Sequence, residues 1–166
     1  MKKIAAVILT ALALGAGGAR GQFISKSGQQ PAAAQAEAVR YLFPEQVALA
    51  AGKPSTVALH FRVAPGLHIQ SHKPGGEFYI PTVFSIPAGA GVKLVAATYP
   101  PGRDMRLPAD PKTPLNVYTG EFVIQARLVA SPGNHLVRAG LRYQACDNTQ
   151  CMPPRTVPVA VDVIGK

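Results

Sequence analysis

The stretch Thr56-Val57-Ala58-Leu59-His60-Phe61-Arg62-Val63 alternates apolar and polar side chains over most of its length. Successive side chains of a β-strand point to opposite faces, so the four apolar residues Val57, Leu59, Phe61 and Val63 would share one face. The pattern predicts a strand that is buried on one side and faces water on the other.

The same alternation recurs along the chain, where Phe122, Ile124, Ala126 and Leu128 form a second example. Pro- and Gly-rich turns separate these runs, which are too short for ordinary helices. The remaining candidate strands are residues 47–50, 82–86, 92–98, 135–145 and 156–163. Seven or eight short strands without an amphipathic helix predict an all-β fold, a single antiparallel β-sandwich.

The longest turn-rich interval is Tyr99–Leu115, which contains five of the 16 prolines of the chain. Irregular segments of this length are uncommon inside compact domains and often carry function. We expect a long loop here, and two interpretations remain open. The loop either contributes to function or serves as a Pro-stiffened crossover between the two sheets.

The first residues are typical of a secretory signal peptide. Two lysines precede an apolar run over residues 4–14, and small residues follow up to Gly21. The run is shorter than the ~20 residues that span a bilayer, so we expect cleavage rather than an uncleaved anchor, and no membrane span afterwards. The predicted organisation is a signal peptide over residues 1–21, a flexible leader over residues 22–40 and a folded domain over residues 41–166.

Composition excludes several other classes of protein. The 166 residues are 48% apolar and 15% charged, which fits one globular domain and not a disordered chain. The formal charge is +9, and it falls to +6 once Lys2, Lys3 and Arg20 leave with the signal peptide. Basic residues are scattered singly, so no nucleic-acid partner is expected. The sequence also lacks a G-x-S-x-G hydrolase motif and a phosphate-binding Gly-rich motif.

The two cysteines, Cys146 and Cys151, stand five residues apart between two predicted strands. Fully extended, that segment would cover ~17 Å, whereas a disulfide holds its Cα atoms ~5.5 Å apart. The chain must therefore turn back, and Asp147-Asn148 are suitable turn formers. We expect a hairpin tip that places both sulfurs side by side. In the oxidising compartment that export implies, they would form a disulfide unless a reductant acts on them.

The role of this pair is open from spacing alone. A closed loop of about six residues gives only ~2 kcal/mol of stabilisation by chain entropy, which makes the bond a weak staple and favours a redox role. Many exported proteins nevertheless carry structural disulfides in short loops. A third interpretation is a Cu(I) site, in which Cys146, Cys151 and Met152 are joined by His68 or His72.

The segment from Leu141 to Val161 resembles the cysteine motif of a known family, the N-terminal periplasmic domain of the thiol:disulfide interchange protein DsbD. The resemblance rests on Tyr143-Gln144-Ala145-Cys146, on Cys151, on Pro153-Pro154 and on the closing strand Thr156-Val157-Pro158-Val159. It implies an immunoglobulin-like β-sandwich. It also implies a dithiol-disulfide pair that receives electrons from a thioredoxin-like domain and passes them to periplasmic oxidoreductases.

Carried onto this chain, the resemblance assigns the catalytic role to Cys146 and Cys151, with Cys151 as the attacking thiol and Cys146 as the resolving thiol. No cofactor and no metal are needed, because the sulfurs carry the electrons. The implied partners are a thioredoxin-like oxidoreductase and a separate membrane electron carrier, and the implied location is the periplasm or another exported compartment. The protein would then be a redox relay of the protein-disulfide reductase type. The alternative is a non-catalytic β-sandwich binding or adaptor module with a structural disulfide.

The chain departs from the family pattern around the cysteines. The family shields its pair with a cap loop in which an acidic residue precedes Glu-Phe-Tyr, but Arg103-Asp104-Met105 stand at the expected place within residues 99–115. Similar letters, Glu77-Phe78-Tyr79, come one predicted strand too early. Tyrosines that the family places on an early strand are replaced here by His68 and Gln70.

Overall fold

The structure is a computed structural model that describes residues 37–43, 46–76, 78–107 and 110–166. All of them belong to one compact unit, residues 33–166. The predicted signal peptide and most of the predicted leader lie outside the described residues. Where the structure describes the chain, it contains strands, turns and bends. No helix in these ranges is long and apolar enough to cross a membrane.

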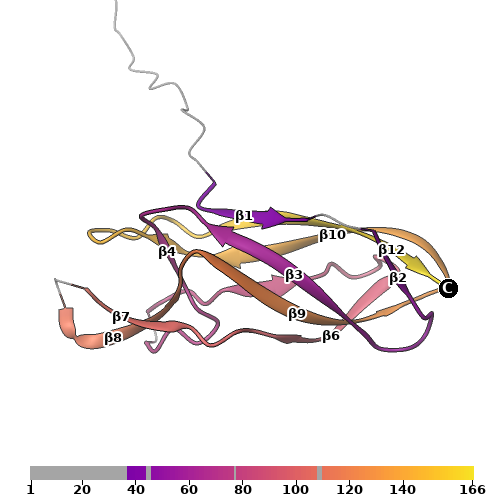
Figure 1. The fold of residues 1–166 in the computed structure, drawn as a ribbon, viewed down its shortest axis with the longest axis horizontal. Helices are drawn as coiled ribbons and strands as arrows, with labels where there is room; N and C mark the ends of the chain where they lie inside the picture. Colours follow the sequence, from indigo (N-terminus) through magenta and orange to yellow (C-terminus); the bar gives the residue numbers. More distant parts are fainter. Residues whose placement is uncertain (1–36, 44–45, 77, 108–109) are drawn as a thin grey trace, which may run out of the picture. The chain divides into compact units, whose positions relative to one another are not determined.

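The first sheet has four antiparallel strands in the order β1-β3-β9-β6 (Figure 1). Its bounds are Val39–Leu42 for β1, Ser55–Val63 for β3, Val92–Thr98 for β6 and Glu121–Ala130 for β9. Strand β3 lies at the centre of the sheet and alternates buried and accessible residues, as its sequence predicts. In particular, Leu59, Phe61 and Val63 are buried, while Arg62 is exposed.

The second sheet has the order β2-β12-β10-β5. Its bounds are Gln46–Leu49 for β2, Val83–Ser85 for β5, Gly133–Tyr143 for β10 and Arg155–Gly165 for β12. The antiparallel ladder between β10 and β12 runs without interruption from Gly133 opposite Gly165 to Tyr143 opposite Arg155. Strand β2 is the exception to the antiparallel pattern, because it runs parallel to β12.

This strand order is that of an immunoglobulin-like sandwich. In that fold strands A, B, E and D form one sheet and strands C, F and G the other. Here β1, β3, β9 and β6 take the places of A, B, E and D, and β5, β10 and β12 take those of C, F and G. The predicted all-β, immunoglobulin-like antiparallel sandwich is confirmed.

The core lies between these two sheets and is built from the inward-facing apolar residues of both. Phe61 of β3 is fully buried, and its ring lies 5.3 Å from that of Phe122 and 5.4 Å from that of Tyr41, centroid to centroid. From the second sheet, Leu141 and Val159 are also fully buried. Burying a large apolar side chain contributes roughly 1.5–3 kcal/mol, so this core is a major source of the folding free energy.

A third sheet stands beside the sandwich, with the order β11-β4-β8-β7. Its strands are His68–Gln70 for β4, Arg103–Leu107 for β7, Asp110–Tyr118 for β8 and Ala145–Cys146 for β11. Strands β7 and β8 form a hairpin in which Arg103 faces Val117 and Met105 faces Leu115. In Figure 1 this hairpin and β4 lie toward the same end of the sandwich.

The third sheet corrects two predictions. The interval from Tyr99 to Leu115 is not a long loop, because most of it belongs to the β7–β8 hairpin. The described residues also hold twelve strands where seven or eight were expected. The predicted strand over residues 135–145 ends at Tyr143, and Ala145 and Cys146 form a separate strand that pairs with β4 instead of β12.

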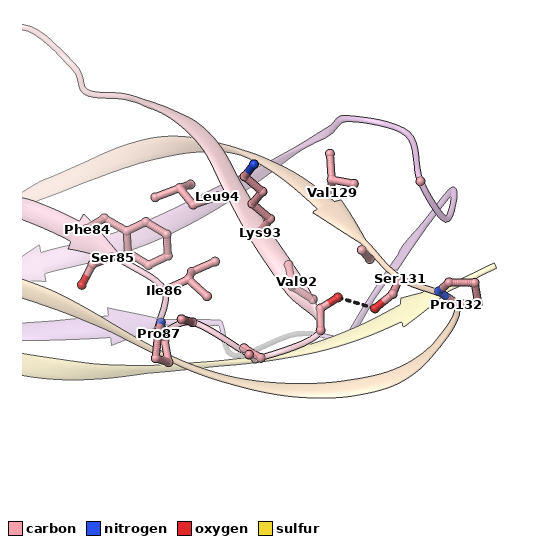
Figure 2. Close-up of a pocket in the computed structure, with 16 residues that line it drawn as sticks. Phe84, Ser85, Ile86, Pro87, Val92, Lys93, Leu94, Val129, Ser131 and Pro132 are labelled. Atoms are coloured by element: carbon pink, nitrogen blue, oxygen red, sulfur yellow. Dashed lines mark hydrogen bonds between the residues drawn. The ribbon is translucent and has the colours of Figure 1, made fainter.

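A surface pocket of about 770 Å³ lies at the far end of the β10–β12 ladder from the cysteines (Figure 2). It is lined mainly by the connection between β5 and β6 and by the turn between β9 and β10. The Ser131 hydroxyl donates a hydrogen bond of 2.7 Å to the Gly91 carbonyl and ties the two connections together. Gly133, which follows this turn, begins β10, whereas the cysteines follow the end of that strand.

Candidate functional site

Cys146 and Cys151 are joined by a disulfide, with their Cα atoms 4.0 Å apart. Cys146 is the last residue of β11, and Cys151 forms an isolated antiparallel bridge with it. The two residues therefore face each other across a very short hairpin. The predicted turn that places both sulfurs side by side is confirmed.

Hydrogen bonds that involve no sulfur close this hairpin. The Asp147 amide donates to the Gln150 carbonyl at 3.0 Å, and the Met152 amide donates to the Ala145 carbonyl at 2.8 Å. The Asp147 carboxylate accepts hydrogen bonds from the Thr149 hydroxyl and amide and from the Gln150 amide, at 2.7–2.8 Å. These donors lower the pKa of Asp147, the bonds from Thr149 contributing most. Asp147 thus acts as the turn former that its residue type predicts.

The two sulfur-bearing residues differ in their access to solvent. Cys146 is 1% exposed, whereas Cys151 is an exposed residue. A thiolate from another protein can therefore approach Cys151 but not Cys146. Because thiol-disulfide exchange requires direct attack on one sulfur, this asymmetry makes Cys151 the entry point for any exchange reaction.

Strand β4 lies beside the buried cysteine and supplies its polar neighbours. His68 pairs directly with Cys146, and Ile69 pairs with Ala145. The Gln70 side-chain amide donates to the Cys146 sulfur at 3.6 Å. Both His68 and Gln70 are buried, and their atoms Nε2 and Oε1 have no hydrogen-bond partner among the described residues. Burial lowers the pKa of His68, while the nearby Asp147 carboxylate acts in the opposite direction.

Two further segments reach the cysteine hairpin. The Gln144 side chain accepts a hydrogen bond from the Ile80 amide at 3.4 Å and donates one to the Met152 carbonyl at 3.3 Å. It therefore links the hairpin to the connection between β4 and β5, which carries Phe78 with 95% of its surface exposed. On another side, Met105 of β7 lines a cavity of about 600 Å³ together with His68 and Asn148.

The structure does not support the copper interpretation. The ring of His72 stacks on Tyr99 at a centroid distance of 3.8 Å, and its Nδ1 lies 3.0 Å from the Thr82 carbonyl. Within the described ranges, no group of three or more His, Cys, Asp or Glu side chains is arranged to hold a metal ion. The two sulfurs are bonded to each other instead.

Of the residues singled out from the sequence, the structure brings Cys146, Cys151 and His68 together. In the sequence Gln144 is one letter of the cysteine motif, and only the structure shows that it links two segments. Its position two residues before the first cysteine is the one sequence signal that could have drawn attention to it.

Fold and site together define a class of protein: an immunoglobulin-like sandwich that carries one disulfide, half exposed and half buried, on an added sheet. The sequence matches the family model described as thiol:disulfide interchange protein DsbD, N-terminal, over residues 38–162. The chain belongs to this family, whose members are periplasmic domains. The resemblance seen in the cysteine motif is thereby confirmed.

One solved structure is similar to the chain. It is the crystal structure of the Neisseria meningitidis DsbD N-terminal domain in the reduced form, with 16% sequence identity and a TM-score of 0.45. The similarity covers 65% of this chain and 77% of that chain. No curated protein matches the sequence.

Proposed function

We propose that this chain is an exported thiol-disulfide exchange module, which relays electrons through Cys146 and Cys151 to or from thioredoxin-fold partners. One observation carries the proposal: within a DsbD N-terminal domain, an exposed Cys151 is bonded to a fully buried Cys146. A structural disulfide needs no exposed member. A relay does, because the partner's sulfur must reach one of the two atoms.

Reduction of the module begins with a thiolate of the partner, which attacks the Cys151 sulfur. The bond between Cys151 and Cys146 breaks, and Cys146 leaves as a thiolate that takes up a proton. A second thiol of the partner then attacks its own sulfur in the mixed disulfide and releases Cys151. The partner is oxidised to a disulfide, and the module holds two thiols. Oxidation by a downstream disulfide follows the same steps in reverse, with Cys151 as the attacking thiol.

The partners follow from this chemistry and from the family. Domains of this family interact with thioredoxin-like proteins, so a thioredoxin-like oxidoreductase is the proposed direct partner. A separate membrane electron carrier would keep that partner reduced. Residues 1–21 would serve as the signal peptide that sends the chain to the periplasm, and residues 22–40 as a leader ahead of the folded domain of residues 41–166. The last two leader residues, Val39 and Arg40, already belong to β1 of the sandwich.

The test is to trap the mixed disulfide. In a Cys146→Ser variant the resolving thiol is missing, so Cys151 should remain bonded to a thioredoxin-fold protein. Mixing this variant with an oxidised thioredoxin-fold protein and separating the products on a non-reducing gel should show a covalent complex that dithiothreitol dissolves. Cys151→Ser is the matched control, since its remaining thiol is buried and should capture far less.

Two results together would contradict the exchange function. If neither single-cysteine variant captures a thioredoxin-fold protein, and the reduction potential of the pair lies below about −300 mV, the disulfide is structural. The chain would then be a non-catalytic binding or adaptor module.

A further inference from the structure

We propose that His68 is the general base that takes the proton from the Cys146 thiol when Cys146 attacks a mixed disulfide at Cys151. This inference rests on the proposed exchange function and adds a proton acceptor to it. It comes from the cross-strand partner of the buried cysteine, a residue that the sulfur chemistry alone leaves without a role.

The pairing of β4 with β11 places His68 directly opposite Cys146. His68 and Cys146 are directly opposite in an antiparallel ladder, so their side chains share one face and their Cβ atoms stand roughly 4.5–5.5 Å apart. Gln70, two residues along β4, shares that face, and its amide reaches the Cys146 sulfur at 3.6 Å. The sulfur therefore lies within reach of side chains from both residues.

The hydrogen-bonding state of His68 fits a role in the reduced protein. In the disulfide form the Cys146 sulfur carries no hydrogen, and the buried Nε2 of His68 has no partner among the described residues. Leaving a buried polar atom unpaired destabilises the folded chain. Reduction turns Cys146 into an S–H donor opposite this ring. The tautomer that leaves Nε2 without a proton can accept from it.

The charges around His68 suit a proton acceptor. Burial lowers the pKa of His68, so the ring is neutral near pH 7 and free to accept a proton. The Asp147 carboxylate on the cysteine hairpin favours the imidazolium that forms. On the other side of β4, Val117 of β8 stands opposite Gln70, on the face that His68 shares, and carries no charge. The remaining charges along the cavity beside His68, Arg62 and Glu121, are paired with each other.

The proton and the two electrons of this step move between the chain and its bound partner. The Cys146 thiol gives its proton to His68 and becomes a thiolate. The thiolate attacks the Cys151 sulfur, the bond between Cys151 and the partner breaks, and the Cys146–Cys151 disulfide forms. The partner leaves as a thiolate, and the proton on His68 passes to it or to solvent. Two electrons have moved from the module to the partner, and His68 is neutral again.

The experiment follows the resolving step without any protein partner. The reduced full chain is mixed with dithiobis-nitrobenzoate, an aromatic disulfide, in a stopped-flow instrument. Attack by the exposed Cys151 releases one coloured thiolate, and attack by Cys146 on the resulting mixed disulfide releases a second. The rate of the second release is measured between pH 5 and pH 9.

In the native protein the second release should be fast near pH 7 and should decline as acid protonates His68. In His68→Gln it should be about 100-fold slower near pH 7, the lower part of the range for general-base catalysis. Its rate should then rise steadily with pH, because only the thiol itself titrates. The rate of the first release, at Cys151, should be the same in His68→Gln as in the native protein.

His60→Gln is the matched control, since it makes the same substitution on β3 of the first sheet and should leave both releases unchanged. Where His68→Gln does not fold, His68→Tyr and His68→Asn provide the same comparison, with folding checked by circular dichroism. A folded His68 variant with the native rate and pH profile of the second release would overturn the proposal. Failure to capture a thioredoxin-fold protein would instead count against the exchange function, because no such protein enters this measurement.

Discussion

The sandwich and the third sheet both bury apolar side chains, but they differ in their buried polar side chains. Between the two sheets of the sandwich, the buried residues are apolar and come from strands that alternate regularly. The buried polar side chains of the described residues are His68, Gln70, Ser71 and Thr82, which belong to β4 and the connection that follows it. Ile69, Tyr118 and Ala145 of the third sheet join the apolar core, so the molecule gathers its buried polar groups, and not its apolar ones, beside the disulfide.

This separation has a physical reason. A buried polar group destabilises a fold unless it is hydrogen-bonded, so polar residues are tolerated where partners can be supplied one by one. In the third sheet the Thr82 hydroxyl donates to the Gln70 carbonyl, and the Ser71 hydroxyl accepts from the Lys73 amide. An unpaired atom such as His68 Nε2 destabilises the oxidised chain. The apolar core can offset that loss.

Weakening the sandwich should have the largest effect on stability. Phe61→Ala removes a fully buried ring that packs on Phe122 and Tyr41, and it should lower the free energy of unfolding by about 3–5 kcal/mol. Urea unfolding followed by circular dichroism measures this loss. Val95→Ala is the control, since Val95 is 48% exposed and should change stability little. Equal losses in the two variants would contradict the placement of the core.

Removal of the disulfide should have a smaller effect. Replacing both cysteines, Cys146→Ala with Cys151→Ala, opens a loop of about six residues and should lower the free energy of unfolding by about 2 kcal/mol. The urea midpoint of this variant should lie between those of the native protein and Phe61→Ala. A loss larger than that of Phe61→Ala would mean that the third sheet, and not the sandwich, dominates stability.

The smallest effect concerns pH and His68. Its folded-state pKa is lowered by burial, so on acidification the unfolded chain takes up a proton at this residue before the folded chain does. Stability linked to His68 is therefore full above the unfolded pKa of about 6.5 and is lost as pH falls toward the lower folded pKa. The difference in urea midpoint between pH 7.5 and pH 5 should be smaller in His68→Gln than in the native protein. An identical difference in His60→Gln and His68→Gln would refute this linkage.

The sandwich could be predicted from the sequence because its strands obey a local rule. Alternation in β3, with Leu59, Phe61 and Val63 inward, and in β9, with Phe122 and Ile124 inward, is visible without knowing any partner strand. The cysteine hairpin was equally predictable, since five steps between two bonded residues leave the chain little choice.

The third sheet could not be predicted in the same way. Strand β4 has three residues, too few for alternation to be recognised, and its polar residues His68 and Gln70 are buried rather than exposed. Strand β8 contains Pro111 and Pro114, which argue against a central strand. Both stand outside the part of β8 that pairs with β4, which consists of Val117 and Tyr118.

The residues around the disulfide could not be predicted from the sequence either. His68 lies 78 positions before Cys146 in the chain, and only the pairing of β4 with β11 brings the two together. Residue spacing and composition do not predict the pairing of strands that lie so far apart in the sequence. The sequence could therefore identify the cysteine pair and name His68 as a possible metal ligand beside it, but it could not predict that His68 and Gln70 pair with this part of the chain.

The hydrogen bonds that close the cysteine hairpin do not include either sulfur. Breaking the bond between Cys146 and Cys151 therefore leaves the turn at residues 147–150 in place, and both thiols remain at a high effective concentration. A flexible loop would have to recover its closed geometry, with the associated loss of chain entropy, before every reoxidation. In kinetic terms the proposed exchange function would make the hairpin a reusable carrier, whose cycle contains chemical steps and no refolding step.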